Sequence, residues 1–177
     1  TYDVFDEDRY FKSGDHPVTV EIGIGPKTKK IGLQICEDLW DHTYSRNLAD
    51  QLKNAGAELI INISASPYRV DRLVDRCNLI KTKVDNTGIP FLYCNLVGAQ
   101  DELIFDGQSV AYDSKGNLIA QGNSFVEEIV IVDFDNQDPI ELNVLQREEK
   151  IYNALVLGVK DYFTKTKVTK IVITSDS

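Results

Sequence analysis

Methionine is absent from this sequence, histidine occurs only twice and cysteine only three times. The two histidines, His16 and His42, are too few for a multi-histidine metal site and leave little scope for a Ser-His-Asp triad. An odd number of cysteines does not form a disulfide framework, so we expect a reducing compartment. No apolar run approaches the roughly 18 residues that a membrane-spanning helix requires. We therefore expect a soluble, cytoplasmic protein with no membrane partner.

Basic residues are also in the minority, with 19 lysines and arginines against 28 aspartates and glutamates. The resulting net charge of −9 argues against a nucleic-acid-binding surface. Apolar residues make up 42% of the 177 residues, an ordinary globular balance at a length that suits one domain or part of a larger protein. The sequence opens on Thr1 and not on methionine, and we expect it to be a fragment.

The apolar pattern predicts strands and helices that alternate through the first part of the chain. Alternating or continuous apolar residues predict strands, and apolar residues at helical spacing followed by glycine predict helices. The expected strands cover residues 17–22, 30–36, 57–63, 90–97, 109–113, 118–121 and 128–134, and the expected helices cover residues 43–54 and 70–86. The second helix carries its apolar face on Val70, Leu73, Val74, Cys77, Ile80 and Val84. This order predicts an α/β fold with parallel strands in the middle and antiparallel strands after them.

A turn-rich acidic segment, residues 133–139, predicts a domain boundary. Beyond it we expect an amphipathic helix over residues 147–163 and a strand over residues 168–173. The apolar stripe of that helix consists of Ile151, Leu155, Val159 and Tyr162. The predicted organisation is a first domain at residues 1–135, a linker at 136–150 and the truncated start of a second domain at 151–177.

Cys36 follows an apolar strand and precedes two acidic residues, Glu37 and Asp38. A nucleophile on the sharp turn that leaves a parallel strand is exposed above the sheet, and the next backbone N–H points to where an oxyanion would form. The alternative is a buried cysteine that only packs at the strand end. A zinc site using Cys36, Asp38, Asp41 and His42 is a weaker hypothesis, because the usual paired Cys or His spacing is missing.

Four other side chains have both a structural and a functional interpretation. Cys77 lies on a helical apolar stripe and Cys94 inside a strand, where we expect packing roles. Ser66 follows a strand in a loop of small residues, a usual place for ligand contacts, although it could simply cap a turn. Arg72 could hold a carboxylate, or it could pair with a neighbouring aspartate on a solvated helix face.

Four segments in this order resemble the glutamine-hydrolysing domain of glutamine-dependent NAD synthetases, a branch of the nitrilase (carbon–nitrogen hydrolase) superfamily. They are residues 2–7 with Arg9-Tyr10-Phe11, residues 35–40 (Ile-Cys-Glu-Asp-Leu-Trp), residues 62–68 (Asn-Ile-Ser-Ala-Ser-Pro-Tyr) and residues 98–107 (Gly-Ala-Gln-Asp-Glu-Leu-Ile-Phe-Asp-Gly). Residues 151–173 resemble the first helix and strand of the family's ATP-dependent synthetase domain. The resemblance implies a partial four-layer α-β-β-α sandwich followed by the start of an ATP-pyrophosphatase-type α/β domain.

The family uses a Glu-Lys-Cys triad, and by this resemblance Cys36 is its nucleophile. The positions of the family's lysine and glutamate fall before Thr1, so we expect residues 1–177 alone to be inactive. The resemblance further implies that Tyr2, Glu37, Ser66 and Arg72 line the glutamine pocket. Residues 98–107 are expected to form a structural hairpin or an interface element.

The resemblance also implies partners and cofactors. The glutaminase part would need no cofactor, whereas the intact enzyme would use ATP and magnesium to make NAD from nicotinic acid adenine dinucleotide, and we expect a homo-oligomer. The family's ATP loop is Ser-Gly-Gly-x-Asp-Ser, but this chain ends in Thr174-Ser175-Asp176-Ser177 without the two glycines, so no ATP binding is expected of these residues alone. Two alternatives stay open: a nitrilase-family amidase with another acceptor or none, and a catalytically dead module that binds a partner.

Overall fold

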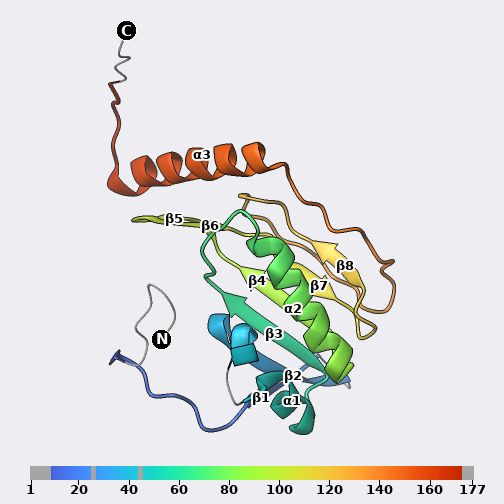
Figure 1. Ribbon diagram of the computed structural model, residues 1–177. Helices are drawn as coiled ribbons and strands as arrows, with labels where there is room; N and C mark the ends of the chain where they lie inside the picture. Colours follow the sequence, from blue (N-terminus) through green and yellow to red (C-terminus); the bar gives the residue numbers. More distant parts are fainter. Residues whose placement is uncertain (1–8, 25–26, 44–45, 173–177) are drawn as a thin grey trace.

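The chain is built around one six-stranded mixed sheet (Figure 1). The computed structural model describes residues 9–24, 27–43 and 46–172. The sheet has the order β1-β2-β3-β4-β7-β8. Its strands are β1 (Val18–Ile24), β2 (Lys27–Ile35), β3 (Leu59–Ser64), β4 (Phe91–Asn95), β7 (Val110–Tyr112) and β8 (Leu118–Gln121).

The middle of the sheet is parallel and its margins are antiparallel. Strands β2, β3 and β4 run parallel, while β1 pairs antiparallel with β2, and β7 and β8 continue antiparallel beyond β4. The alternation expected from the sequence is therefore confirmed. Parallel neighbours need a crossover connection, and the helices α1 (Leu48–Asn54) and α2 (Arg72–Thr87) supply the two crossovers.

One face of the sheet is covered by α1, α2 and the short 3-10 helix η2 (Cys36–Thr43) (Figure 1). The main core lies between them and contains the fully buried Leu39, Leu52, Ile60, Ile80 and Phe91. Helix α2 ends at Gly88, whose left-handed backbone (φ 70°) donates its N–H to the carbonyl of Val84. The glycine stop expected from the sequence is therefore confirmed.

The other face of the sheet is largely open among the described residues. Ile35 is 71% exposed and Ile63 is 60% exposed on it, and a smaller cluster covers only the β7–β8 side. That cluster consists of Ala111, Ile119 and Ala120 with Leu92, Val132 and Phe134 packed against them. Of the expected α-β-β-α layers, the described residues thus supply one helical layer and one sheet.

A second, two-stranded sheet pairs β5 (Val97–Gln100) with β6 (Leu103–Asp106), so residues 98–107 do form a hairpin. The long helix α3 (Arg147–Thr166) packs against it, where the N–H of Ala99 donates to Asp161 Oδ2 at 2.8 Å and the Lys165 ammonium donates to the Ala99 carbonyl. The apolar stripe of α3 is largely exposed: Leu155, Val159 and Tyr162 are each more than half exposed. No described helix is long and apolar enough to cross a bilayer.

Three predicted elements differ from the structure. Residues 128–134 form no strand, with Ile129 93% exposed, and residues 168–172 form none either. Both segments have strand-like patterns, but a strand needs a partner to accept its backbone hydrogen bonds, and no described segment pairs with them. The helix expected at 43–54 begins only at Leu48, where Asn47 accepts the N–H of Asp50 as an N-cap.

A buried ion pair fastens η2 to α2. The Lys83 ammonium donates to Asp41 Oδ1, and Asp41 Oδ2 accepts the N–H of Leu48 at 2.9 Å. Both side chains are only 7% exposed. Removing one partner of such a pair leaves the other charge buried without compensation.

Lys83→Met is expected to lower the free energy of unfolding by about 3–5 kcal/mol, because Asp41 would stay buried without its counter-ion. Lys81→Met is the matched control, since Lys81 pairs with Asp85 on the exposed side of α2, where the loss should stay below about 1 kcal/mol. Urea unfolding followed by circular dichroism measures both. Equal losses in the two variants would contradict the role assigned to the buried pair.

Candidate functional site

Cys36 sits at a sharp bend where β2 ends and η2 begins. Its φ is 42°, a left-handed conformation that a non-glycine residue rarely adopts, and the residue is half-buried. Strained backbone of this kind clusters at functional sites, where it fixes the direction of a side chain. The bend matches the strand-end turn that the sequence predicts for a nucleophile, and Cys36 is not sealed inside the core.

Side chains on both sides of the bend hold it in place. Asp38 Oδ2 accepts the N–H of Ile35 at 2.8 Å, and the carbonyl of Cys36 accepts from Asn62 Nδ2 at 3.4 Å. Burial raises the pKa of Asp38; the Ile35 N–H opposes this rise and Asp41 adds to it. Leu39 is completely buried beneath the turn. The bend is thus tied to both β2 and β3.

The loop after β3 brings Ser66 to the same edge of the sheet. Asn62 connects the end of β3 with the bend at Cys36. Its Oδ1 accepts from Ser64 Oγ at 2.6 Å, and its Nδ2 donates to the Cys36 carbonyl. Ser66 is 4% exposed, and its backbone N–H donates to Asn95 Oδ1 at 2.9 Å. The loop is therefore fixed between the bend and the end of β4.

Tyr93 lies beneath this edge, and several neighbouring groups shift the pKa of its phenol. Burial raises the pKa of the Tyr93 phenol, and the guanidinium of Arg76 opposes that rise, as do the hydroxyls of Ser64 and Ser66. Cys36 is close enough to add to the rise. One buried phenol is thus near both the thiol and the Ser66 loop.

Arg72 opens α2 and reaches the bend through Trp40. Its guanidinium carbon lies 4.7 Å from the centroid of the Trp40 ring, and Trp40 belongs to η2. Arg72 is buried, so the interpretation of it as a residue of a solvated helix face is wrong. A guanidinium stacked on an aromatic ring is held in a fixed orientation, and its planar fork matches the geometry of a carboxylate.

Four of the five predicted site residues therefore lie at the carboxyl edge of β2 and β3: Cys36, Glu37, Ser66 and Arg72. Glu37 is half-buried directly after Cys36. Tyr2 lies outside the described residues, and so does the candidate ATP loop at residues 174–177. Neither the glutamine contacts nor the ATP loop is tested by the geometry of the described chain.

The other two cysteines differ from each other. Cys77 is 4% exposed in the core, where burial raises the pKa of its thiol against the opposing effects of Tyr112 and Arg76, so its predicted packing role is confirmed. Cys94 is exposed, and its predicted packing role is wrong for the described chain. The reason is the strand period: Cys94 points to the open face of the sheet, opposite the helices.

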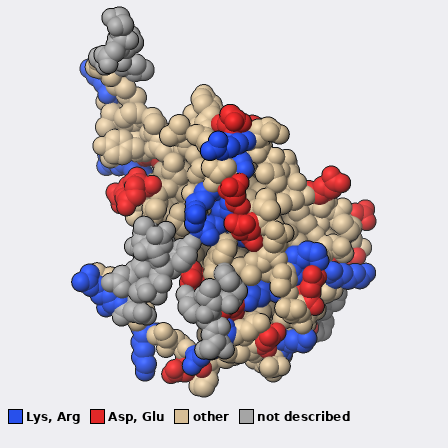
Figure 2. Space-filling model, in the orientation of Figure 1, with Lys and Arg blue, Asp and Glu red and all other residues tan. Residues whose placement is uncertain are grey.

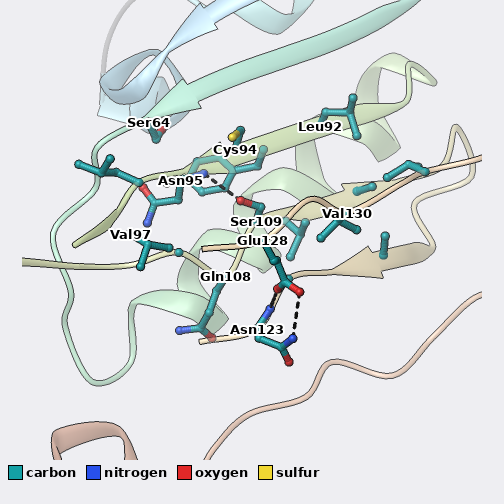
Figure 3. A pocket seen from close by; sticks show the side chains of 18 of the residues that line it. Ser64, Leu92, Cys94, Asn95, Val97, Gln108, Ser109, Asn123, Glu128 and Val130 are labelled. Carbon is teal, nitrogen blue, oxygen red and sulfur yellow. Dashed lines mark hydrogen bonds between the residues drawn. The ribbon is translucent and has the colours of Figure 1, made fainter. Parts of the chain in front are cut away.

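A hollow of about 650 Å³ also lies on that open face (Figure 3). Ser64, Cys94, Asn95 and Gln108 line it, and Cys36 is not among its lining residues. The Asn95 N–H donates to Ser109 Oγ at 3.1 Å within it. The hollow and the Cys36 edge thus meet at the ends of β3 and β4 but are different surfaces.

A buried polar network that was not predicted from the sequence lies behind the Ser66 loop. It consists of Arg76, Asn95, Asp106 and Gln108, of which Arg76 is 0% exposed and Asp106 is 1% exposed. Burial raises the pKa of Asp106, and the nearby Arg76 guanidinium is the first of several groups that oppose this. A charged residue between Leu73 and Cys77 on the apolar face of α2 is the sequence feature that could have indicated it.

Metal and charge features add little to the site. No three His, Cys, Asp or Glu side chains of the described residues are grouped so as to hold a metal ion. On the helical face shown in Figure 2, basic and acidic side chains are interspersed, with no visible field of one sign among the described residues. The arrangement suits nucleophilic chemistry at Cys36 with charged groups beside it.

Iodoacetamide is expected to alkylate Cys36 at least about tenfold faster than Cys77 in the folded protein, because burial raises the pKa of the Cys77 thiol and blocks access to it. A Cys94→Ser background removes competition from the third cysteine, and peptide mass spectrometry locates the adducts. Urea should equalise the rates. Faster alkylation of Cys77 in the native state would contradict the geometry of the bend.

Comparison with known proteins agrees with this architecture. Residues 3–142 match the family model for carbon-nitrogen hydrolase. Proteins called glutamine-dependent NAD(+) synthetase from Thermotoga maritima and Synechocystis sp. are 34% identical over 209 residues and 38% identical over 187 residues. These alignments cover 97% and 98% of this chain but 35% and 33% of the relatives, so the chain spans about a third of their length.

Solved structures give the same result. The glutamine-dependent NAD+ synthetase from Acinetobacter baumannii in complex with ADP aligns with a TM-score of 0.80 and 32% identity, over 93% of this chain and 31% of that one. An amidase of the nitrilase superfamily from Nesterenkonia shares the fold, with a TM-score of 0.52 at 18% identity over 64% of this chain and 40% of that one. The predicted resemblance and the α/β class are confirmed, and the chain belongs to the carbon–nitrogen hydrolase family.

Proposed function

We propose that this chain is the nucleophile-bearing part of a glutaminase within a glutamine-dependent NAD synthetase. The supporting observation is the left-handed bend that presents Cys36 beside Glu37, Ser66 and Arg72 in a chain of the carbon–nitrogen hydrolase family. The relatives that match nearly the whole chain are named for that activity.

The proposed reaction begins when the Cys36 thiolate attacks the side-chain carboxamide carbon of glutamine. The C–N bond then breaks, the nitrogen takes up a proton and leaves as ammonia, and a thioester remains on Cys36. Water cleaves the thioester to glutamate and restores the thiol. We assign support of the oxyanion to the backbone N–H that follows Cys36, at the bend where β2 passes into η2.

Charged neighbours of Cys36 suit the two ends of the glutamine backbone. We assign the carboxylate of glutamine to Arg72, whose guanidinium is oriented by Trp40, and the ammonium group to Glu37 and Tyr2. We assign Ser66 to the same glutamine site. Proton transfer to ammonia and activation of the water are assigned to a glutamate, and oxyanion support to a lysine, both outside residues 1–177.

The ammonia would be consumed in an ATP-dependent amidation of nicotinic acid adenine dinucleotide to NAD. ATP and magnesium would act at a second site beyond the described residues, in a cytoplasmic homo-oligomer. Helix α3 would begin that second domain, and its contact with the β5–β6 hairpin supports a close connection between the two parts.

Two rival functions use the same fold. A nitrilase-family amidase would hydrolyse an amide without passing ammonia to a second site. Such an enzyme is a rival because the Nesterenkonia amidase has the same fold. A dead binding module would keep the fold without the reaction. The match of relatives along 97% of the chain, through the α3 region, favours the synthetase.

Cys36→Ala is expected to abolish glutamine-dependent NAD synthesis in the full-length protein while ammonia-dependent synthesis stays near the wild-type rate, because only amide cleavage needs the thiol. Cys94→Ala is the control, since Cys94 faces away from this edge. Product formation with each nitrogen donor is the measurement. Equal loss with both donors would mean that Cys36 supports folding and not amide cleavage.

Residues 1–177 expressed alone are expected to release no ammonia from glutamine above the rate of the Cys36→Ala version of the same segment. The reason is that the proposed proton-transfer glutamate and the lysine that would lower the thiol pKa are not among them. An ammonia assay at saturating glutamine makes the comparison. Turnover by the wild-type segment would place the whole catalytic apparatus within these residues.

A further inference from the structure

We propose that Asn95, Asp106 and Arg76 are positioning residues that hold the Ser66 loop at the distance and angle glutamine requires. The inference rests on the proposed glutaminase function and adds a positioning role for the buried polar network behind the Ser66 loop. Asn95 is 6% exposed and ends β4, while Asp106 ends the β5–β6 hairpin.

Asn95 holds the loop with both ends of its amide. Its Oδ1 accepts the N–H of Ser66 at 2.9 Å, and its Nδ2 donates to the Ser66 carbonyl at 3.4 Å. The backbone pairing of β3 with β4 ends before Ser66, at the pair Ser64 and Asn95, where the Leu96 N–H donates to the Ser64 carbonyl. The side chain thus takes the place of a further strand residue and fixes the backbone of Ser66 on both sides.

Asp106 determines which way the Asn95 amide faces. Its Oδ1 accepts from Asn95 Nδ2 at 3.2 Å, and its Oδ2 accepts from Gln108 Nε2 at 2.7 Å. An ionised carboxylate can only accept, so the NH₂ end of Asn95 must face it and the oxygen must face the Ser66 N–H. A flipped amide would place its oxygen against two acceptors, the Ser66 carbonyl and Asp106 Oδ1, and its NH₂ against the Ser66 N–H, so the loop would lose its anchor.

The Arg76 guanidinium opposes the rise in the pKa of Asp106 that burial causes, and it therefore favours the ionised carboxylate. Its Nη2 lies 3.7 Å from Asp106 Oδ1, its Nη1 donates to the Gly107 carbonyl at 3.4 Å, and its guanidinium carbon is 4.7 Å from the Tyr93 ring centroid. These contacts are long, and a buried pair of this kind is weak evidence for stability, because desolvation opposes the attraction. The Arg76–Asp106 pair instead orients the Asn95 amide, and through Asn95 it fixes the backbone of Ser66.

The test compares Asn95→Asp with Asn86→Asp in the full-length protein, because Asn86 is exposed on α2 and undergoes the same chemical change. Asn95→Asp replaces the donating NH₂ by an acceptor that faces Asp106 and the Ser66 carbonyl. We expect kcat/KM for glutamine to fall by about tenfold to a hundredfold, as for a buried polar group left unsatisfied. Ammonia-dependent NAD synthesis should match that of Asn86→Asp.

A labelling experiment separates positioning from general damage. A diazoketone analogue of glutamine should label Cys36 at least about tenfold more slowly in Asn95→Asp, whereas iodoacetamide, which needs no glutamine pocket, should label it at the wild-type rate. Equal slowing by both reagents, or none with the glutamine analogue, would overturn the inference. If wild-type Cys36 resists the glutamine analogue altogether, the proposed function fails instead.

Asp106→Asn provides a second variant of nearly unchanged shape, with Asp85→Asn, at the exposed pair with Lys81, as its control. We expect the same split between the two reagents, because the neutral amide no longer dictates the orientation of Asn95. Failure of both Asn95→Asp and Asp106→Asn to fold would assign the network to stability alone and would also overturn the inference.

Discussion

The candidate site depends on the parallel pairing of β2, β3 and β4. Strands that run parallel release the chain at one edge of the sheet, so the residues that follow them meet in space although they are far apart in sequence. Cys36 follows β2, the Ser66 loop follows β3, and Asn95 ends β4. The crossover into α2 returns from the same edge, which puts Arg72 and the positive end of the helix against η2. The parallel pairing therefore brings Cys36, the Ser66 loop and the Arg72 guanidinium to one edge of the sheet.

The features that follow from local physics could be predicted from the sequence. Strand and helix periods located β2, β3, β4 and α2, and the apolar strand before Cys36 indicated the bend. Residues 128–134 could not be predicted correctly, because alternation shows that a segment could pair but not whether a partner is present. The packing role predicted for Cys94 was wrong for a related reason. Periodicity identifies the two faces of a strand, but only the assembled layers decide which face is covered.

Helix α2 links the site to the rest of the fold through three inward-facing cations. Arg72 stacks on Trp40, Arg76 on Tyr93, and Lys83 pairs with Asp41. Their spacing places all three on one side of the helix, next to the apolar stripe. The apolar pattern predicted that Val74 is buried, but Val74 is 41% exposed. The buried side of α2 is occupied by the three cations as well as by the other apolar residues. Polar residues on a core-facing helix side therefore carried information about the site that a search for hydrophobic periodicity passed over.

The uneven covering of the sheet has a consequence for the order of folding. Strands β2, β3 and β4 and their crossover helices follow one another along the chain, so α1 and α2 can cover their side of the sheet once residues 27–95 are present. The opposite side, with Ile35 and Ile63 facing out, gains no such local partner from the described residues. Until further protein covers it, that side is an exposed apolar surface prone to aggregation. Chaperones or rapid assembly would have to protect the nascent protein at this stage.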